Sequence, residues 1–307
     1  MEALTINILS WAAPFLILLM VAEFVFSKLK GHKNLYKLKD VLASSAMGFG
    51  AMLINSVVKL MYFGFIFYLV YEVFNPSVNG TRTNIFGYTS FGYAWYVWLI
   101  CQVLDDFSHY WVHRLNHTIR FMWAAHIVHH SSEHYNFSTS LRLSWISALY
   151  KPLFYLWIPA IGFPPEMVVT CLGVEAVWQF LLHTSYCPKL GILEHIFITP
   201  KQHQVHHAVN ESYLDKNHGA IFNIFDRLFG SWKDYDDSID IHYGVTSPPN
   251  SFNPIVIVTH EYKAIWRDIR KSKNFKEILM YVFGPPGWSP NGETLTVKQM
   301  QLNLKQS

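Results

Sequence analysis

The sequence predicts an all-α integral membrane protein with about four transmembrane helices and a cytoplasmic, histidine-rich helical cap that holds two metal ions. The first observation is composition: 51% of the 307 residues are hydrophobic and only 15% are charged, which is too apolar for an ordinary soluble domain. The second is a set of eight histidines whose spacing places imidazole rings on shared faces of helices. Together they indicate a membrane protein that binds metal.

Apolar stretches of sequence predict the membrane helices. They are residues 8–26, 41–73, 93–104 and 146–182. A spanning helix needs about 20 apolar residues, so the third stretch is short on its own. It continues through Asp105 and Asp106 toward the first histidines, which fits a helix that leaves the bilayer and carries ligands beyond it.

The fourth stretch is interrupted by Phe163-Pro164-Pro165. Proline removes a backbone donor and restricts the residue before it, so this tripeptide predicts a turn between two helices. The expected organisation is a membrane anchor (residues 1–110), the first two groups of histidines (111–145), a transmembrane helical hairpin (146–183) and a cytoplasmic cap with the third group (184–307).

Basic residues set the expected orientation. The loop after the first apolar stretch carries Lys28, Lys30, Lys33, Lys37 and Lys39, whereas the loop over residues 72–92 has one basic residue, Arg82. Loops rich in lysine stay in the cytoplasm. We therefore expect a multi-pass protein of the bacterial inner membrane or the endoplasmic reticulum, with the histidines on the cytoplasmic side.

Charge and cysteine content argue against other classes of protein. The formal net charge is only +3, and no basic block is interleaved with stacking aromatics, so no nucleic-acid partner is expected. The three cysteines have no metal-ligand or redox spacing, and they imply no disulfide framework.

Three histidine boxes are the predicted metal site. The first box is His113 and His117, the second is His126, His129 and His130, and the third is His203, His206 and His207. Side chains three and four residues apart share one face of a helix, so three such faces could enclose two metals. Imidazole suits zinc, copper, iron and nickel alike, so the ligands alone leave the metal open. His183 is a candidate ninth ligand, and His109 is expected not to bind metal.

Several other polar residues are candidates for supporting roles. Asp106 lies two helical turns before His113, where its carboxylate could orient a ligating ring. Asn136 and Asp215 are weaker candidates of the same kind. Glu23 and Glu175 interrupt apolar helices, where an ionised carboxylate is costly, so each is expected to face another helix. The sequence identifies no further catalytic residue and no cofactor-binding residue.

The residues around the boxes extend the pattern. They include Tyr110-Trp111-Val112-His113-Arg114-Leu115-Asn116-His117, Met122-Trp123-Ala124-Ala125-His126, His129-His130-Ser131-Ser132-Glu133, Thr199-Pro200, Asp215-Lys216-Asn217 and Gly284-Pro285-Pro286-Gly287-Trp288. These stretches resemble the fatty acid hydroxylase and sterol desaturase superfamily of membrane di-iron enzymes. Within it, they are most similar to the members that cleave glyceryl ethers.

The resemblance implies that the eight box histidines bind two irons and that the enzyme inserts one oxygen atom of O₂ into a lipid from the bilayer. In the ether-cleaving members, hydroxylation beside the ether oxygen gives a hemiacetal, which collapses to a fatty aldehyde and a glycerol derivative. The implied electron donor is tetrahydrobiopterin or a redox protein.

Other functions fit parts of the pattern. The same cluster could hydroxylate or desaturate a sterol, a fatty acid or a carotenoid. A haem electron carrier or a zinc transporter would place its histidines inside the spanning segments, whereas these boxes lie beyond them. Hydrolytic zinc chemistry lacks its His-Glu-x-x-His motif.

Overall fold

The computed structural model describes residues 8–87 and 91–306, so the first seven residues of the predicted anchor lie outside it. The longest helices are α1 (Ile8–Leu29), α2 (Leu38–Met61), α4 (Trp95–Thr118) and α8 (Pro165–Leu182). A π-helical turn, η1 (Tyr62–Ile66), carries α2 without a break into α3 (Phe67–Phe74). The described residues are mostly helical, as predicted.

The shorter elements complete the chain. They are β1 (Ser77–Val78), β2 (Thr81–Arg82), α5 (Arg120–His130), η2 (Phe137–Leu141), α6 (Ser147–Tyr150), η3 (Lys151–Tyr155), α7 (Trp157–Ala160), η4 (Gly191–His195), α9 (Pro200–His207), α10 (Ile224–Leu228), α11 (Pro254–Ile269), α12 (Phe275–Phe283) and α13 (Val297–Leu304). The two strands form one antiparallel hairpin, in which Ser77 pairs with Arg82.

Three helices of the described chain are long and apolar enough to cross a membrane: Ile8–Leu29, Leu38–Phe74 and Pro165–Leu182. Many apolar side chains of the first two face outward; Trp11 and Leu18 of α1, for example, are 76% and 64% exposed. Such surfaces are costly in water and favourable in lipid. The third predicted stretch, residues 93–104, lies in the first half of α4, which continues through Asp105 and Asp106 and is not among these three.

The region before α8 differs from the predicted hairpin. Residues 147–160 form three short helical segments, α6, η3 and α7, instead of one long helix. Pro152 lies in the first turn of η3 and Pro159 lies within α7, and each lacks the N–H that a continuous helix would use. The expected turn at Phe163-Pro164-Pro165 is present, with α8 beginning at Pro165.

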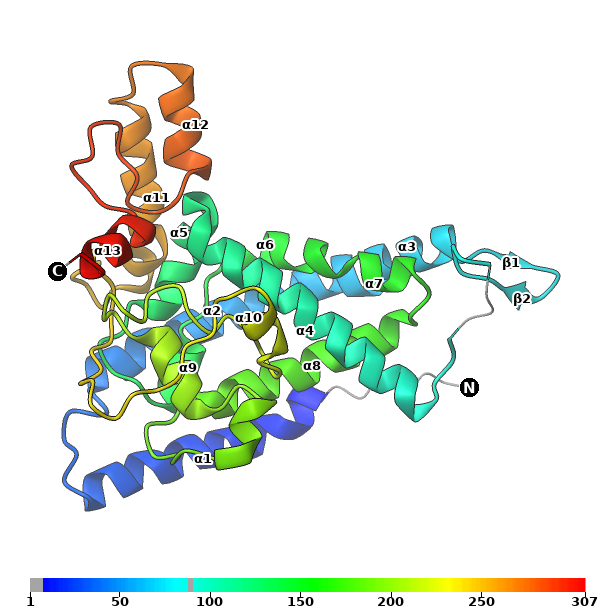
Figure 1. Cartoon of the computed structure of the whole chain (residues 1–307). Helices are drawn as coiled ribbons and strands as arrows, with labels where there is room; N and C mark the ends of the chain where they lie inside the picture. The colour runs from blue at the N-terminus through cyan, green and yellow to red at the C-terminus, as the bar shows by residue number, and fades with distance from the viewer. Residues whose placement is uncertain (1–7, 88–90, 307) are drawn as a thin grey trace.

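The long helices run side by side, with α4 packed against both α5 and α8 (Figure 1). Between α3, α4, α7 and α8 lies an apolar core that contains Phe67, Val97, Ile158 and Val168. The strands lie at one end of this bundle, and α5, α9 and the C-terminal helices lie at the other. The histidine boxes therefore sit at the end opposite the strands.

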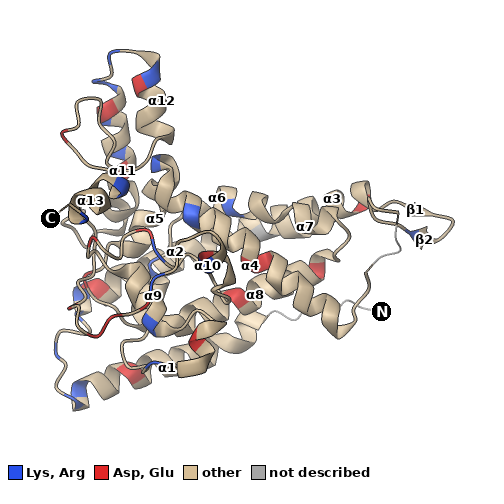
Figure 2. Ribbon diagram, in the orientation of Figure 1, with Lys and Arg blue, Asp and Glu red and all other residues tan. Residues whose placement is uncertain are grey.

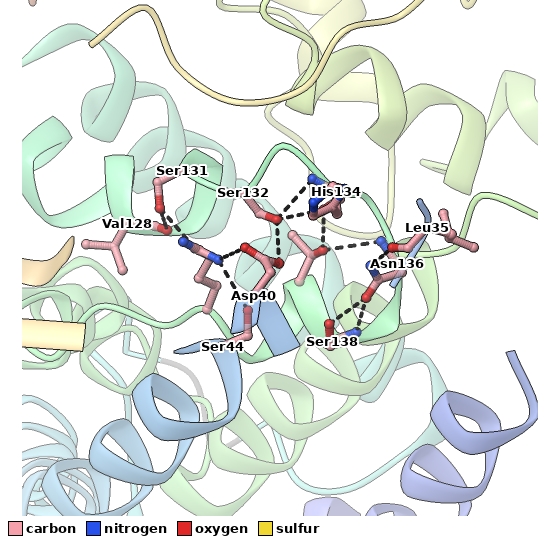
Figure 3. Close-up of polar contacts among 11 residues, drawn as sticks. Leu35, Asp40, Ser44, Val128, Ser131, Ser132, His134, Asn136 and Ser138 are labelled. Carbon is pink, nitrogen blue, oxygen red and sulfur yellow. Dashed lines mark hydrogen bonds and ion pairs between the residues drawn. The ribbon is translucent and has the colours of Figure 1, made fainter. Parts of the chain in front are cut away.

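A buried ion pair connects α2 to the chain that follows α5 (Figure 3). Arg142 Nη1 lies 2.6 Å from Asp40 Oδ1, and their side chains are only 2% and 5% exposed. Ser132 Oγ donates to the other oxygen of Asp40 at 2.8 Å, and Arg142 Nε donates to Ser131 Oγ at 2.9 Å. These contacts fix the residues that follow the second histidine box.

We expect Asp40→Ala to destabilise the protein by about 3–5 kcal/mol, because it leaves the Arg142 guanidinium buried without its counter-charge. The midpoint of thermal unfolding in detergent measures the effect. Asp237→Ala is the matched control, since its ion pair with Lys189 is exposed and its loss should leave the midpoint unchanged. Equal midpoints for the two variants would contradict the assigned role of Asp40.

Candidate metal centre

The first histidine box lies in the last two turns of α4. His113 and His117 are four residues apart, so both rings leave the same face of the helix, and their centroids are 5.3 Å apart. His113 Nδ1 donates to the backbone carbonyl of His218 at 2.8 Å. His117 Nδ1 lies 3.3 Å from a carboxylate oxygen of Asp215. Each ring is therefore oriented through Nδ1 and presents Nε2 to the interior.

The second box lies in α5, and its three rings point in two directions. His126 and His130 share a face and approach the first box; their Nε2 atoms are 3.1 Å apart, and His126 Nε2 is 3.0 Å from His113 Nε2. His129 is turned about 100° from His130, as consecutive helical residues are. Its Nε2 instead lies 3.1 Å from Nε2 of His183.

The third box lies in α9, which begins at Pro200 after a capping box between Thr199 and Gln202. His203 and His207 share one face, with their Nε2 atoms 3.2 Å apart. His206 points toward the first box, and its ring centroid is 4.4 Å from that of His113.

The boxes thus combine into two groups. In each group, one ligand atom per residue lies within 4.8 Å of all the others. Group one is His113, His117, His126, His130 and His206; group two is His129, His183, His203 and His207. The groups are adjacent, because the rings of His130 and His207 stack at 4.4 Å. The structure brings together all eight box histidines and the candidate ninth, His183.

In group two, a hydrogen bond leaves an unprotonated nitrogen of His183 facing two other rings. His183 Nδ1 donates to the carbonyl of Gln179 at 2.7 Å, so the neutral ring keeps a lone pair on Nε2. That atom lies 3.1 Å from His129 Nε2 and 3.3 Å from His203 Nε2. Nitrogens that bind one ion at about 2.1 Å with right-angle geometry are about 3.0 Å apart. The spacing fits a shared cation.

Group one carries a second sign of metal binding. His206 Nδ1 donates to the carbonyl of Lys216 at 2.8 Å, which leaves a lone pair on Nε2. In the described chain, this Nε2 and that of His117 are buried without a hydrogen-bond partner. Buried polar atoms are rarely left unpaired. The residues present therefore fit a metal ion in each group.

Burial keeps these rings neutral, the form that binds metal. It lowers the pKa of His113, His126 and His206 well below 6.5, and neighbouring imidazoles lower these values further. In group two, burial lowers the pKa of His183 to about 4, against an opposing hydrogen bond to Gln179.

His218 also lies near the site, although the spacing of the histidine boxes did not identify it. Its ring centroid lies 4.9 Å from that of His117, and its buried Nδ1 has no hydrogen-bond partner among the described residues. It stands alone in the sequence, outside any box, so spacing gave no signal for it. The fold brings it to the edge of group one.

The loop that carries His218 is held by buried acids. Asp226 accepts hydrogen bonds from the backbone N–H groups of His218 and Gly219 at 2.8 and 2.7 Å. Asp106 accepts from the N–H groups of Ile221 and Phe222 at 2.6 and 3.2 Å. The contacts of Asp106 therefore differ from the expected one: its carboxylate binds the loop whose His218 carbonyl orients His113, and it does not bond the ring itself.

The other polar candidates have distinct contacts. Asp215, at a left-handed φ of 55°, reaches His117 directly. Asn136 caps η2 through Ser138 and donates to the Leu35 carbonyl, away from the rings. His109 Nδ1 lies 2.6 Å from Glu175 and belongs to neither histidine group. Glu23 faces other segments, as expected, and accepts from Thr184 beside His183.

A cavity of about 1140 Å³ opens beside the histidines. His117, His130, His206 and His207 line it together with Trp123. The C-terminal elements form the opposite wall. Their lining residues include Ala264, Arg267, Glu277, Tyr281 and Trp288. A polar molecule of moderate size could therefore reach both groups from this side.

Comparison with known proteins agrees with this geometry. Residues 98–231 match the family model described as fatty acid hydroxylase. The matched region is similar to this family. It contains all three boxes together with His183 and His218. No solved structure matches the chain.

Several curated proteins are also similar to this chain. Alkylglycerol monooxygenase of Homo sapiens is 32% identical over 94% of this chain and 61% of its own length. The enzyme of that name from Xenopus tropicalis is 35% identical over 64% of this chain and 43% of its own. An ornithine lipid hydroxylase of Rhizobium tropici is 28% identical over 47% of the chain and 44% of its own. The chain thus spans about three fifths of the length of the human relative and less than half of the length of the other two.

Proposed function

We propose that this chain is a membrane-bound, non-haem di-iron monooxygenase that cleaves the O-alkyl bond of glyceryl ethers. The convergence of nine buried or half-buried histidines into two adjacent groups carries the proposal. Neutral imidazoles suit iron, and two irons suit a reaction with dioxygen. The human relative is named for this activity.

The reaction balances with one O₂, two electrons and two protons. One oxygen atom enters the C–H bond beside the ether oxygen and the other leaves as water. The resulting hemiacetal collapses to a fatty aldehyde and a free glycerol hydroxyl. The iron pair, when bound, supplies the activation of O₂.

The protein would position that pair and exclude water. Group one would hold one iron and group two the other. The carbonyls of His218, Lys216 and Gln179 fix three ring orientations through Nδ1, and the Asp215 carboxylate supports a fourth. Most of the histidine rings are buried among protein atoms, which would limit the access of water to the metals.

Iron analysis and product identification test this proposal together. Purified protein should contain about two irons per chain and release fatty aldehyde from an alkylglycerol in the presence of O₂ and a reductant. Full activity in iron-free protein would contradict it.

Hydroxylation of another lipid is the second candidate. The ornithine lipid hydroxylase is a relative over nearly half of this chain, so the same groups could serve a different lipid. Incubation with alkylglycerol, ornithine lipid, fatty acid, sterol and carotenoid separates the candidates. A hydroxylated or desaturated product without aldehyde would favour this second function.

We also propose that the electron donor is a small reduced heterocycle, such as tetrahydrobiopterin, that enters the cavity beside the histidines. Trp123, Tyr281 and Trp288 offer aromatic faces there, and Arg267 and Glu277 offer polar partners. A redox protein would have to act from outside this cavity.

Ala264→Trp should raise the KM for the donor by about tenfold or more, because the indole fills part of the cavity. Steady-state kinetics with varied donor concentration measures the effect, while iron content should stay unchanged. Lys263→Trp is the matched control, since Lys263 is exposed beside Ala264 and does not line the cavity. An equal KM in the two variants would exclude donor binding there.

A further inference from the structure

Helices α11 and α12 form a hairpin with an uncovered apolar face. Phe275, Leu279 and Phe283 of α12 recur every fourth residue, so they share one side of the helix. They are 70%, 42% and 61% exposed, and no residue of α12 is buried. Trp266 of α11 is also 62% exposed. An exposed apolar face of this kind indicates a binding surface.

The tip of the hairpin is basic. Arg270, Lys271, Lys273 and Lys276 are all exposed. Glu261 and Asp268, the acidic residues of α11, both form ion pairs with Arg120, at 2.8 and 2.7 Å. Among the described residues, none of the four basic side chains of the tip forms an ion pair, and Glu277 accepts a hydrogen bond from the Lys273 backbone N–H at 2.7 Å. The uncovered surface therefore combines aromatic and aliphatic side chains with a net positive charge.

The base of the hairpin is fixed close to a membrane helix. Ile257 and Val258 of α11 pack in one buried cluster with Ala43 and Met47, which lie near the start of the spanning helix Leu38–Phe74. Figure 1 shows the hairpin projecting steeply from the long helices at the histidine end of the bundle. Figure 2 shows basic residues at this end, on the hairpin and at the end of α1.

We propose that the α11–α12 hairpin lies in the headgroup layer of the same bilayer that the long helices cross, with Phe275, Leu279 and Phe283 among the acyl chains and the basic tip against anionic lipid. An amphipathic helix with lysine and aromatic residues binds membranes in this way. The attachment to the start of α2 keeps the hairpin near the surface where that helix enters. This inference is independent of the metal and of the reaction.

Spin labelling of the full-length protein in nanodiscs tests the proposal. A nitroxide is attached to Leu279→Cys in a Cys187→Ser background, since Cys101 and Cys171 are buried. Its accessibility to O₂, which concentrates in lipid, is compared with that to a water-soluble nickel chelate. The reference is the same label on Glu293→Cys, which lies on an exposed loop before α13. Unchanged metal content in both variants shows that the fold is retained.

We expect the label at position 279 to favour O₂ and the label at position 293 to favour the nickel chelate, in discs of phosphatidylcholine with phosphatidylglycerol. In phosphatidylcholine alone, the label at position 279 should become more accessible to nickel, because the basic tip loses its anionic partner. Equal nickel accessibility at the two positions would overturn the proposal. Shielding of position 279 from both reagents would also overturn it, because this would indicate a second copy or another protein on this face. So would an equal depth of the label in the two lipid mixtures.

Discussion

His206→Ala and His129→Ala are each expected to lower turnover by more than about a hundredfold, which exceeds the 10–100-fold effect of groups that only orient a metal ligand. The structure adds a distinction between the variants. His206 belongs to group one and His129 to group two, so each substitution should remove one of two metals and leave the other group complete. Metal analysis of the purified variants, alongside activity, measures both effects.

His242→Ala is the matched control for these variants, because that side chain is 69% exposed and lies outside both groups. It should retain both metals and full activity. Substantial turnover in either His206→Ala or His129→Ala would count against the two-group assignment. Loss of both metals from one substitution would show that the groups do not fill independently.

Acidification is expected to remove the metals cooperatively below about pH 6. Ligation requires neutral imidazole, and an unfolded histidine takes up a proton near pH 6.5. Burial lowers the pKa of His207 well below this value and that of His183 to about 4, so the folded protein binds fewer protons than the unfolded chain in this window. Stability is therefore complete above pH 6.5 and is lost as the pH falls toward 4.

Gel filtration at pH values from 8 to 4, followed by metal analysis and thermal unfolding, tests this expectation. Metal content and the unfolding midpoint should be constant at high pH and fall together across the window, because several rings titrate in one cluster. Stoichiometric metal at pH 4 would contradict histidine ligation.

The apolar helices and the histidine spacing could be predicted from the sequence, because each depends on residues close together in one segment. Apolar runs long enough to cross a bilayer are visible without any fold, as α1 illustrates. The i, i+4 spacing of His113 and His117 fixes a shared direction as soon as a helix forms. These features depend only on the geometry of one helix.

Contacts between segments distant in sequence could not be predicted without the tertiary structure. Asp106 faces His113 on a helical projection, yet its partners are backbone N–H groups more than a hundred residues away. The loop at Asp215 approaches His117 from a similar sequence distance. The short helices before α8 also emerged only in the structure, since an apolar run does not show whether its prolines end a helix or bend it.

The sequence by itself determined the long apolar segments and the helical spacing of the three boxes, because hydropathy and helical periodicity act within one segment. Only the tertiary structure decided how the boxes divide, that His129 leaves the face of His126 and His130 to join His183, and that His218 borders group one. The physical reason is that a metal site is a convergence of side chains from several helices. Its membership depends on how α4, α5, α8 and α9 pack, which no single segment encodes.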